Sequence, residues 1–341
     1  MRRLLVLLLL PLAACLPGGE REVLRLSGQT MGTQYHIIAI GEDLDEVALG
    51  VQLETVLADV DSKMSNWNPE SEISRFSASQ DTSPQPISPE LAHVIQGAAE
   101  VHTQSEGMFD VTLGPLIELW GFGTRQAEDP VPSEAEIAKA LTRVGQSRLL
   151  RLDPEFPSLA KEMQEVEVNV AAIAKGYGID AVAAILHDAG IENYMVEIGG
   201  DLVTRGQNDK GQPWRIGIET PEPGSQNNVQ RVIALSGLGM ASSGDYRNFF
   251  ERDGRRYSHL LDPTTGRPVT HATTSATVLA ENAMMADAWA TAMLVLGRQR
   301  GLAVAERHGV AVFFISRDRQ ADGQSYILDE SSAFTALTKT D

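Results

Sequence analysis

The sequence is poor in cysteine: Cys15 is the one thiol among 341 residues. A single cysteine excludes disulfide bonds within the chain, so the fold must be held together by its apolar core. Hydrophobic residues make up 43% of the sequence, which is enough for one large core or two modest ones.

Positive charge is also scarce. The chain has 28 lysines and arginines against 46 aspartates and glutamates, which gives a net charge of −18. This excess of negative charge argues against nucleic acid or an anionic membrane surface as a partner. A ligand that carries phosphates would need a local exception, either a bound cation or a lysine placed beside it.

The N-terminal apolar run, residues 4–10, is too short to span a bilayer. It follows Arg2-Arg3 and precedes Leu12-Ala13-Ala14-Cys15, an order typical of a secretory signal. Leu-Ala-Ala-Cys resembles a bacterial lipobox, in which the cysteine is lipidated and becomes the new N-terminus. The alternative is an ordinary signal followed by a chance cysteine.

We therefore expect a signal peptide over residues 1–14, a lipidated tether over 15–22 and one domain over 23–341. The domain is expected to have two lobes that do not fold independently. The chain would be exported and anchored through Cys15 on the periplasmic face of a bacterial membrane, with the inner membrane favoured.

Several common site motifs are missing. The chain has no Gly-x-x-x-x-Gly-Lys-Ser/Thr loop and no His-Glu-x-x-His pair, and Gly237-Leu238-Gly239 lacks the third glycine of a dinucleotide motif. Apart from His259, the histidines are interpreted as structural or surface residues: His36, His93, His102, His187, His271 and His308.

The stretch 241–291 concentrates the chemistry that is present. His259 lies three residues before Asp262, which opens an Asp-Pro-Thr-Thr-Gly turn. A carboxylate beside an imidazole orients it and raises its basicity, which suits a general base. The alternative is a structural histidine near a turn. Residues 242–246 are expected to form a polar turn of their own.

Asp287 and Thr291 lie four residues apart in a helical pattern and therefore share one face of the helix. Carboxylate and hydroxyl oxygens are hard ligands that suit Mg²⁺ or Ca²⁺ rather than zinc. The alternative is a solvated helix face that binds no metal.

Regular structure is expected along the whole domain. Ser88 and Pro89 begin a helix, Ser133 and Glu136 form a capping box, and residues 43–60 have helical period. Strands are expected over residues 23–26, 34–40, 148–152, 166–170, 194–198, 214–219, 231–235, 274–280 and 310–316, the last of which closes the sheet.

Two further segments are candidate ligand contacts. Trp67 lies in a polar loop, where it either stacks on a ligand ring or caps the edge of the core. Residues 169–177 read as a strand that enters a helix through small residues, with Lys175 in the first turn. Such helix N-termini bind anions, so Lys175 is expected to pair with a phosphate.

Four blocks of the sequence resemble the ApbE-type FAD:protein FMN transferases, and they occur in that family's order. The resemblance covers about residues 23–318. Asn169 stands where the family usually has an aspartate, and Ala171-Ala172 stand for two glycines. The blocks are Met-Ser-Asn-Trp (64–67) with Ser-Glu-Ile-Ser-Arg-Phe (71–76), Phe-Asp-Val-Thr-Leu-Gly-Pro-Leu (109–116) with Trp-Gly-Phe-Gly (120–123), residues 169–177, and residues 242–269 with the helix 286–297.

The resemblance implies an α+β fold, with mixed sheets flanked by helices and FAD in a cleft between two lobes. It implies Mg²⁺-dependent transfer of FMN from FAD to a Thr or Ser hydroxyl of a target protein, with release of AMP. His259 would be the base, and Asp262 would orient it or contact the ligand. Asp287, Thr291 and the Ala172 carbonyl would bind the metal. The expected FAD contacts are Met31, Trp67, Phe109, Asp110, Val111, Asn169, Lys175 and Ser258.

Two other functions remain open at this point. One is an Mg²⁺-dependent FAD pyrophosphatase, in which water replaces the acceptor hydroxyl. The other is a flavin-binding lipoprotein without catalytic activity. The acceptor protein cannot be read from the sequence, although the family implies subunits of membrane redox complexes.

Overall fold

The computed structural model describes residues 21–122, 131–222, 228–245, 249–252, 254–318 and 325–339. The expected signal peptide, Cys15 and most of the expected tether lie outside these ranges, so those expectations stay predictions. No helix in the described part of the chain is long and apolar enough to cross a membrane.

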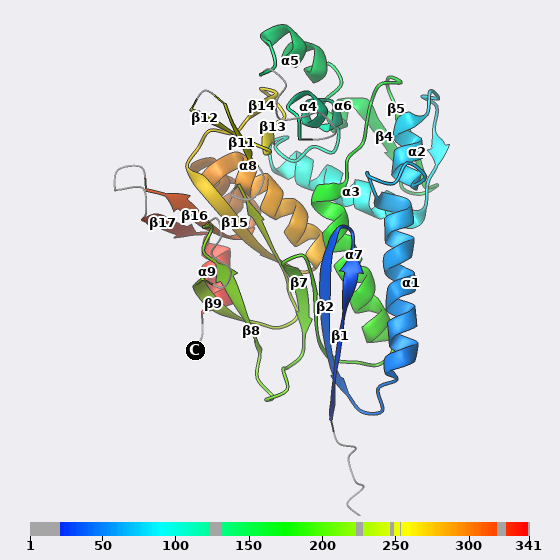
Figure 1. The fold of residues 1–341 in the computed structure, drawn as a ribbon, viewed down its shortest axis with the longest axis vertical. Coiled ribbons are helices and arrows are strands. Elements are labelled where there is room, and N and C mark those ends of the chain that lie inside the picture. The colour runs from blue at the N-terminus through cyan, green and yellow to red at the C-terminus, as the bar shows by residue number, and fades with distance from the viewer. Residues whose placement is uncertain are drawn as a thin grey trace, which may run out of the picture.

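The fold is organised around an eight-stranded sheet in which every neighbouring pair is antiparallel (Figure 1). This confirms the expected α+β class. In spatial order the strands are β1 (Glu22–Thr30), β2 (Thr33–Gly41), β6 (Asn193–Ile198), β7 (Asp201–Arg205), β10 (Gly239–Gly244), β15 (Thr273–Ala280), β16 (Ala311–Arg317) and β17 (Tyr326–Glu330).

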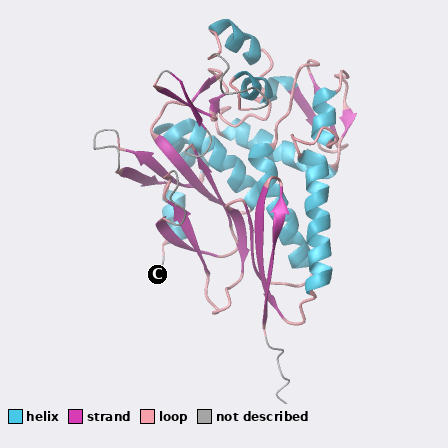
Figure 2. Ribbon diagram, viewed as in Figure 1, coloured by secondary structure: helices cyan, strands magenta, loops and turns pink. Residues whose placement is uncertain are grey.

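Both faces of the sheet are covered, because its central strands are apolar on both sides. In β15 the side chains of Ala276 and Val278 pack into the helical core, whereas Leu279 packs into a smaller cluster on the other face. Figure 2 shows the long helices gathered beside the sheet. They are α1 (Glu46–Met64), α3 (Pro89–Gln104), α7 (Ala171–Asp188) and α8 (Ala283–His308). The smaller cluster belongs to the hairpin β8 (Trp214–Glu219) and β9 (Val229–Leu235) and to α9 (Ser332–Thr338).

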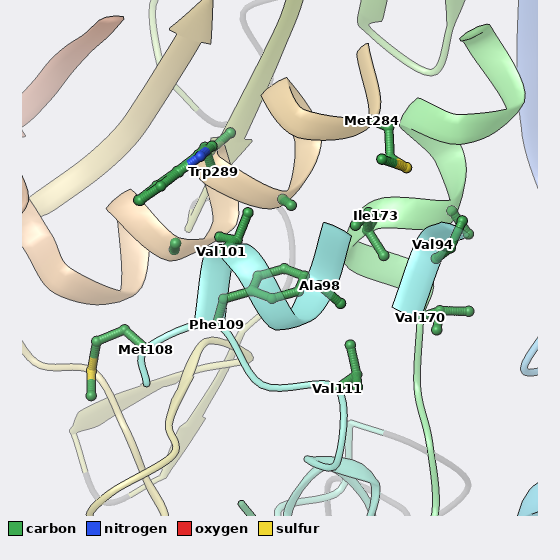
Figure 3. Packing of buried hydrophobic residues seen from close by; sticks show 14 of the residues in the cluster. Val94, Ala98, Val101, Met108, Phe109, Val111, Val170, Ile173, Met284 and Trp289 are labelled. Atoms are coloured by element: carbon green, nitrogen blue, oxygen red, sulfur yellow. The ribbon is translucent and has the colours of Figure 1, made fainter. Parts of the chain in front are cut away.

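Shorter elements lie over one end of the helices, at the top of Figure 1. These elements are α2 (Glu72–Ala78), β3 (Gln85–Pro86), α4 (Gly114–Leu119), α5 (Glu134–Leu141), α6 (Gln146–Leu149), β4 (Leu150–Asp153), β5 (Ser158–Lys161), β11 (Phe249–Arg252), β12 (Arg255–Ser258), β13 (Leu261–Asp262) and β14 (Arg267–Pro268). The hydrophobic residues of α2, α6, β4 and β5 join the main core around α3, α7 and α8, which Figure 3 shows from close by. Those of α4, α5 and β13 form a smaller cluster of their own, against which β11 and β12 pack.

Helices α7 and α8 approach each other closely at Gly176. A Cβ atom at this position would lie 2.3 Å from the carbonyl oxygen of Ala283 at the start of α8. Only glycine therefore allows this crossing. Asp180, one turn further along α7, accepts hydrogen bonds from the main-chain N–H groups of Ala283 and Met284 at 2.9 and 2.8 Å.

Local sequence signals predicted the helix ends well. Ser88 caps α3 and Pro89 is its first residue, and Ser133 and Glu136 form both bonds of a capping box. The helix that was expected over residues 43–60 begins later, at Glu46, because Asp45 is the residue that caps it.

Three predictions about turns and strands of the sheet were wrong, and the strand expected over residues 148–152 begins only at Leu150, because residues 146–149 form α6. Ser242, Ser243 and Gly244 form no turn but belong to β10, paired with β15. Residues 166–170 form no strand, because the bonds of this extended segment go to single partners such as the Val111 carbonyl, 2.7 Å from Asn169 N. The strand at 311–317 is not the last of the sheet, since β17 pairs along its outer edge.

The close crossing at Gly176 yields a matched pair of substitutions. Gly176→Ala should lower the free energy of unfolding by about 1–3 kcal/mol, because the added methyl meets main-chain atoms that cannot move independently. Gly50→Ala in α1 meets nothing within 4 Å and should raise it by about 0.5–1 kcal/mol. Urea denaturation measures both. Equal effects of the two substitutions would contradict this account of the α7–α8 contact.

Candidate active site

A cleft of about 570 Å³ opens where α1 ends and α7 begins. Its walls include the turn between β1 and β2, the segment 60–67, the first turn of α7 and Gly199 between β6 and β7. Three of the expected contacts, Met31, Trp67 and Lys175, line it. Trp67 stands at its edge with 74% of its surface exposed, so the stacking interpretation is favoured over a core-capping one.

Met31 has a left-handed backbone conformation, with φ of 47°. Together with Gly32, at φ of 73°, it forms the two-residue connection between paired Thr30 and Thr33, which is the turn that matches the twist of a hairpin. Its side chain reaches α7, where a Cβ at Gly178 would lie 2.6 Å from the Met31 methyl. The hairpin thus places Met31 against the helix that begins in the cleft.

A second cavity, of about 460 Å³, shares Asn66 and Trp67 with the first, and Asn169 lines it. The Asn66 side chain donates to the Val168 carbonyl at 2.7 Å and accepts from Val170 N at 3.0 Å. These two bonds fix the main chain on both sides of Asn169. The Asn169 Oδ1 accepts from Ala171 N at 3.0 Å, so this side chain satisfies the N–H of the first residue of α7.

Phe109, Asp110 and Val111 are placed differently from the expectation. The side chains of Phe109 and Val111 are buried in the main core (Figure 3). The Asp110 carboxylate accepts from Thr112 N at 2.7 Å and from Gln146 N at 2.9 Å. These side chains are buried, so any contact of this segment with a nucleotide would have to use the main chain.

Lys175 and Asp287 lie together at the start of α7. Asp287 is buried, and its Oδ2 accepts from Gly176 N at 3.0 Å. Burial raises the pKa of Asp287, against the opposing effects of the Lys175 ammonium and the Gly176 N–H. Burial lowers the pKa of Lys175, which the carboxylates of Asp287 and Glu197 oppose. Lys175 also forms an ion pair with the buried Asp201.

The donor set fits a hard cation. In a helix the N–H of residue 176 points at the carbonyl of residue 172, and here the same N–H reaches Asp287. The Ala172 carbonyl and the Asp287 carboxylate must therefore lie close together. Thr291, one turn along α8 from Asp287, has its hydroxyl 3.2 Å from the Ser243 hydroxyl. These oxygens suit Mg²⁺, whereas the described residues contain no cluster of three histidine, cysteine or acidic side chains.

His259 follows β12 and lies beside aromatic rings. Its ring meets that of Phe122 nearly edge-on, with centroids 6.3 Å apart, and Phe122 in turn packs on Phe250. The neighbouring Ser258 is buried, and its Oγ accepts from Leu260 N. The imidazole is thus placed by a hairpin and an aromatic cluster.

Asp262 is engaged in its own turn. Its Oδ1 accepts from Thr264 N at 2.7 Å, from the Thr264 hydroxyl at 2.6 Å and from Thr265 N at 3.2 Å. Trp120 Nε1 closes the turn by donating to the Gly266 carbonyl at 2.7 Å. These bonds give Asp262 a role in shaping the loop after His259. The expected orientation of the imidazole by its carboxylate stays a prediction.

Comparison with known proteins decides the family. Residues 31–314 match the model of the ApbE family. The chain belongs to the ApbE family. The FAD:protein FMN transferase of Haemophilus influenzae is 40% identical over 345 residues, covering 98% of this chain and 96% of its relative. That of Vibrio cholerae is 42% identical over 321 residues, covering 92% and 94%.

Solved structures agree with this family. The flavin transferase ApbE from Vibrio cholerae superimposes with a TM-score of 0.84 at 39% identity, covering 93% of this chain and 99% of the other. The apo form of the flavinyl transferase ApbE from Pseudomonas stutzeri gives 0.84 at 35% identity, covering 94% and 98%.

Sequence reasoning missed three polar residues of this ApbE-family chain: Asn66, which lines the cleft, Asp201, which pairs with Lys175, and Asp180, which joins α7 to α8. Asn66 lies inside the block Met-Ser-Asn-Trp (64–67) and Asp201 lies outside the four blocks, and nothing in their local spacing marks a role. Their partners are 26 to 104 residues away, and only the fold brings them together.

The buried carboxyl group of Asp180 should make the free energy of unfolding depend on pH. Burial raises its pKa to about 6, above the ordinary value near 3.8, so the folded state holds this proton more tightly than the unfolded state. The resulting stabilisation is present below about pH 4 and is lost as the pH rises through about 6. Between pH 4 and 7.5, Asp180→Asn should therefore gain up to about 3 kcal/mol of unfolding free energy relative to the wild type.

Chemical denaturation at the two pH values measures this difference, with Asp188→Asn, an exposed position of the same helix, as the control. A difference between wild type and Asp180→Asn that does not change with pH would show that the carboxyl group titrates in its ordinary range.

Proposed function

We propose that this protein transfers FMN from FAD to a threonine or serine hydroxyl of a target protein, with Mg²⁺ and with release of AMP. The observation that carries the proposal is the contact of the buried Asp287 with the start of α7, whose residue Lys175 lines the cleft. The names of the curated relatives, FAD:protein FMN transferase, supply the reaction that these groups suit.

Although the protein is strongly negative, the cleft offers positive groups for the phosphates of a dinucleotide and an aromatic ring for one of its bases. The first turn of α7 presents main-chain N–H groups and the positive end of the helix dipole. Lys175 is the one lysine among the described residues that line the cleft. The exposed Trp67, between the two cavities, supplies a ring on which a base or flavin can stack, worth about 1–3 kcal/mol.

In the proposed reaction the acceptor hydroxyl oxygen attacks the phosphorus of the FMN half of FAD. The new phosphoester bond forms as the bond to the AMP phosphate breaks, and AMP leaves with the electron pair. His259 takes the proton of the hydroxyl, and the aromatic rings beside it hold the imidazole in place. Mg²⁺, held by Asp287, Thr291 and the Ala172 carbonyl, would supply positive charge to the pyrophosphate.

The nucleophile belongs to the acceptor protein, so this chain needs no catalytic serine or cysteine. We further propose that the enzyme is a lipoprotein anchored through Cys15 on the periplasmic face of a membrane, where its acceptor would be a membrane redox subunit. Mass spectrometry of a candidate acceptor, co-expressed with and without this chain, tests the transfer directly. Free FMN without a labelled acceptor would instead indicate a pyrophosphatase.

His259→Ala should lower the rate of acceptor labelling about 10²- to 10⁴-fold, the usual contribution of a general base, while FAD binding changes by no more than a few-fold. Labelling is followed by protein-bound flavin fluorescence and binding by quenching of FAD fluorescence. His308→Ala, at the exposed end of α8, is the control. If the His259→Ala variant labels the acceptor at the wild-type rate, His259 is not the general base.

Asp287→Asn should abolish the response of the reaction to Mg²⁺, because it removes the one carboxylate of the proposed metal site. The rate is measured across a Mg²⁺ titration, with Asp209→Asn in an exposed loop as the control. A half-saturating Mg²⁺ concentration that stays unchanged in Asp287→Asn would place the metal elsewhere.

A further inference from the structure

We propose that Asp201 sets the affinity of the site for Mg²⁺ by holding Lys175 away from Asp287. This inference rests on the Mg²⁺ dependence proposed above. It gives the ion pair of Lys175 and Asp201 a role besides the expected pairing of Lys175 with a phosphate.

Asp287 has two competing partners. It is the proposed carboxylate ligand of the cation, and it also interacts with the ammonium group of Lys175. A lysine that pairs fully with a metal-ligand carboxylate neutralises it and lowers its affinity for a divalent ion. The site therefore needs a second anion that occupies the lysine.

The fold positions Asp201 as that second anion. Gly199 and Gly200, with φ of 58° and 96°, form the two-residue connection that pairs Ile198 with Asp201 at the start of β7. One oxygen of the Asp201 carboxylate accepts from Ser242 N in β10 at 3.1 Å. The other oxygen is bonded to Lys175. The side chain is only 4% exposed, so it cannot turn away into water.

The charges of Lys175, Asp201 and Asp287 make the site negative. Lys175, Asp201 and Asp287 together carry one net negative charge, which favours a divalent cation. Glu197 also acts on Lys175, but its own oxygens are bonded to His36 and to Gly200 N. Removing the charge of Asp201 would leave Lys175 and Asp287 as a neutral pair.

Four proteins test the proposal: the wild type, Asp201→Asn, Lys175→Met and the double variant. The net charge of the three positions is −1, 0, −2 and −1 in that order. A unit of charge several ångströms from a divalent ion changes its affinity about tenfold, even at the dielectric constant of water. Mg²⁺ should therefore bind most tightly to Lys175→Met, about tenfold more weakly to the wild type and the double variant, and weakest to Asp201→Asn.

Affinity is measured with Mg²⁺ alone, by calorimetric titration and by the rise in Tm, so neither FAD nor an acceptor is needed. Asp59→Asn is the control, because it removes an exposed Asp–Lys ion pair in α1 and should leave Mg²⁺ binding unchanged. Recovery of affinity in the double variant supports the proposal, since a merely structural role of Asp201 would leave both variants equally weak.

Two results would overturn the inference: Mg²⁺ affinity of Asp201→Asn equal to that of the wild type, or no recovery in the double variant. Failure of the proposed function looks different. In that case the wild type binds Mg²⁺ and the four proteins keep the expected order, but a co-expressed acceptor carries no flavin.

Discussion

The crossing of α7 and α8 at Gly176 is the constraint on which the rest of the structure depends. The missing side chain lets the start of α8 approach the first turns of α7, and the N–H of the same residue binds Asp287. Gly176 therefore determines both the packing of the two helices and the position of the Asp287 carboxylate. It brings the carboxylate of one helix to the N-terminal end of the other, where anions are favoured.

The site is assembled from segments that are each fixed from outside the cleft. Asn66 holds the segment before α7, the glycine turn after β6 holds Asp201, and aromatic packing holds His259. The cost of burying Asp287, Lys175 and Asp201 is offset because each charge has a partner of opposite sign or a main-chain donor. Such a site is ordered before any ligand arrives.

Much of the fold follows from local sequence signals, because caps and apolar periodicity act over a few residues. Ser88, Ser133 and the strand Trp214–Glu219 are where the sequence predicts them. Ser242 to Gly244 were misread as a turn because small polar residues favour turns locally, whereas pairing with β15 decides their structure. The strand predicted over residues 166–170 was wrong for the opposite reason. Their apolar pattern is that of a strand, but in the described part of the chain no strand pairs with them.

For the candidate site, too, the sequence predicted what local motifs carry and missed what contacts between distant segments decide. Motif resemblance identified Met31, Trp67, Lys175 and Asp287, and the first three of these line the main cleft. It could not identify Asp201 or Asn66 as partners of that site, because their bonds join segments far apart in the chain. It also could not tell that Phe109 and Val111 are buried, since burial is decided by helices α3 and α8 packed above them.

The β1–β2 hairpin fixes the distance between the cleft and the start of β1. Strand β1 has nine residues, which at about 3.3 Å per residue span roughly 30 Å, and Met31 stands at its far end in the cleft. An enzyme tethered through Cys15 would thus carry its cleft on a stiff arm. Under the anchor proposed above, the length of β1 would act as a ruler that sets the distance between the tether and the cleft.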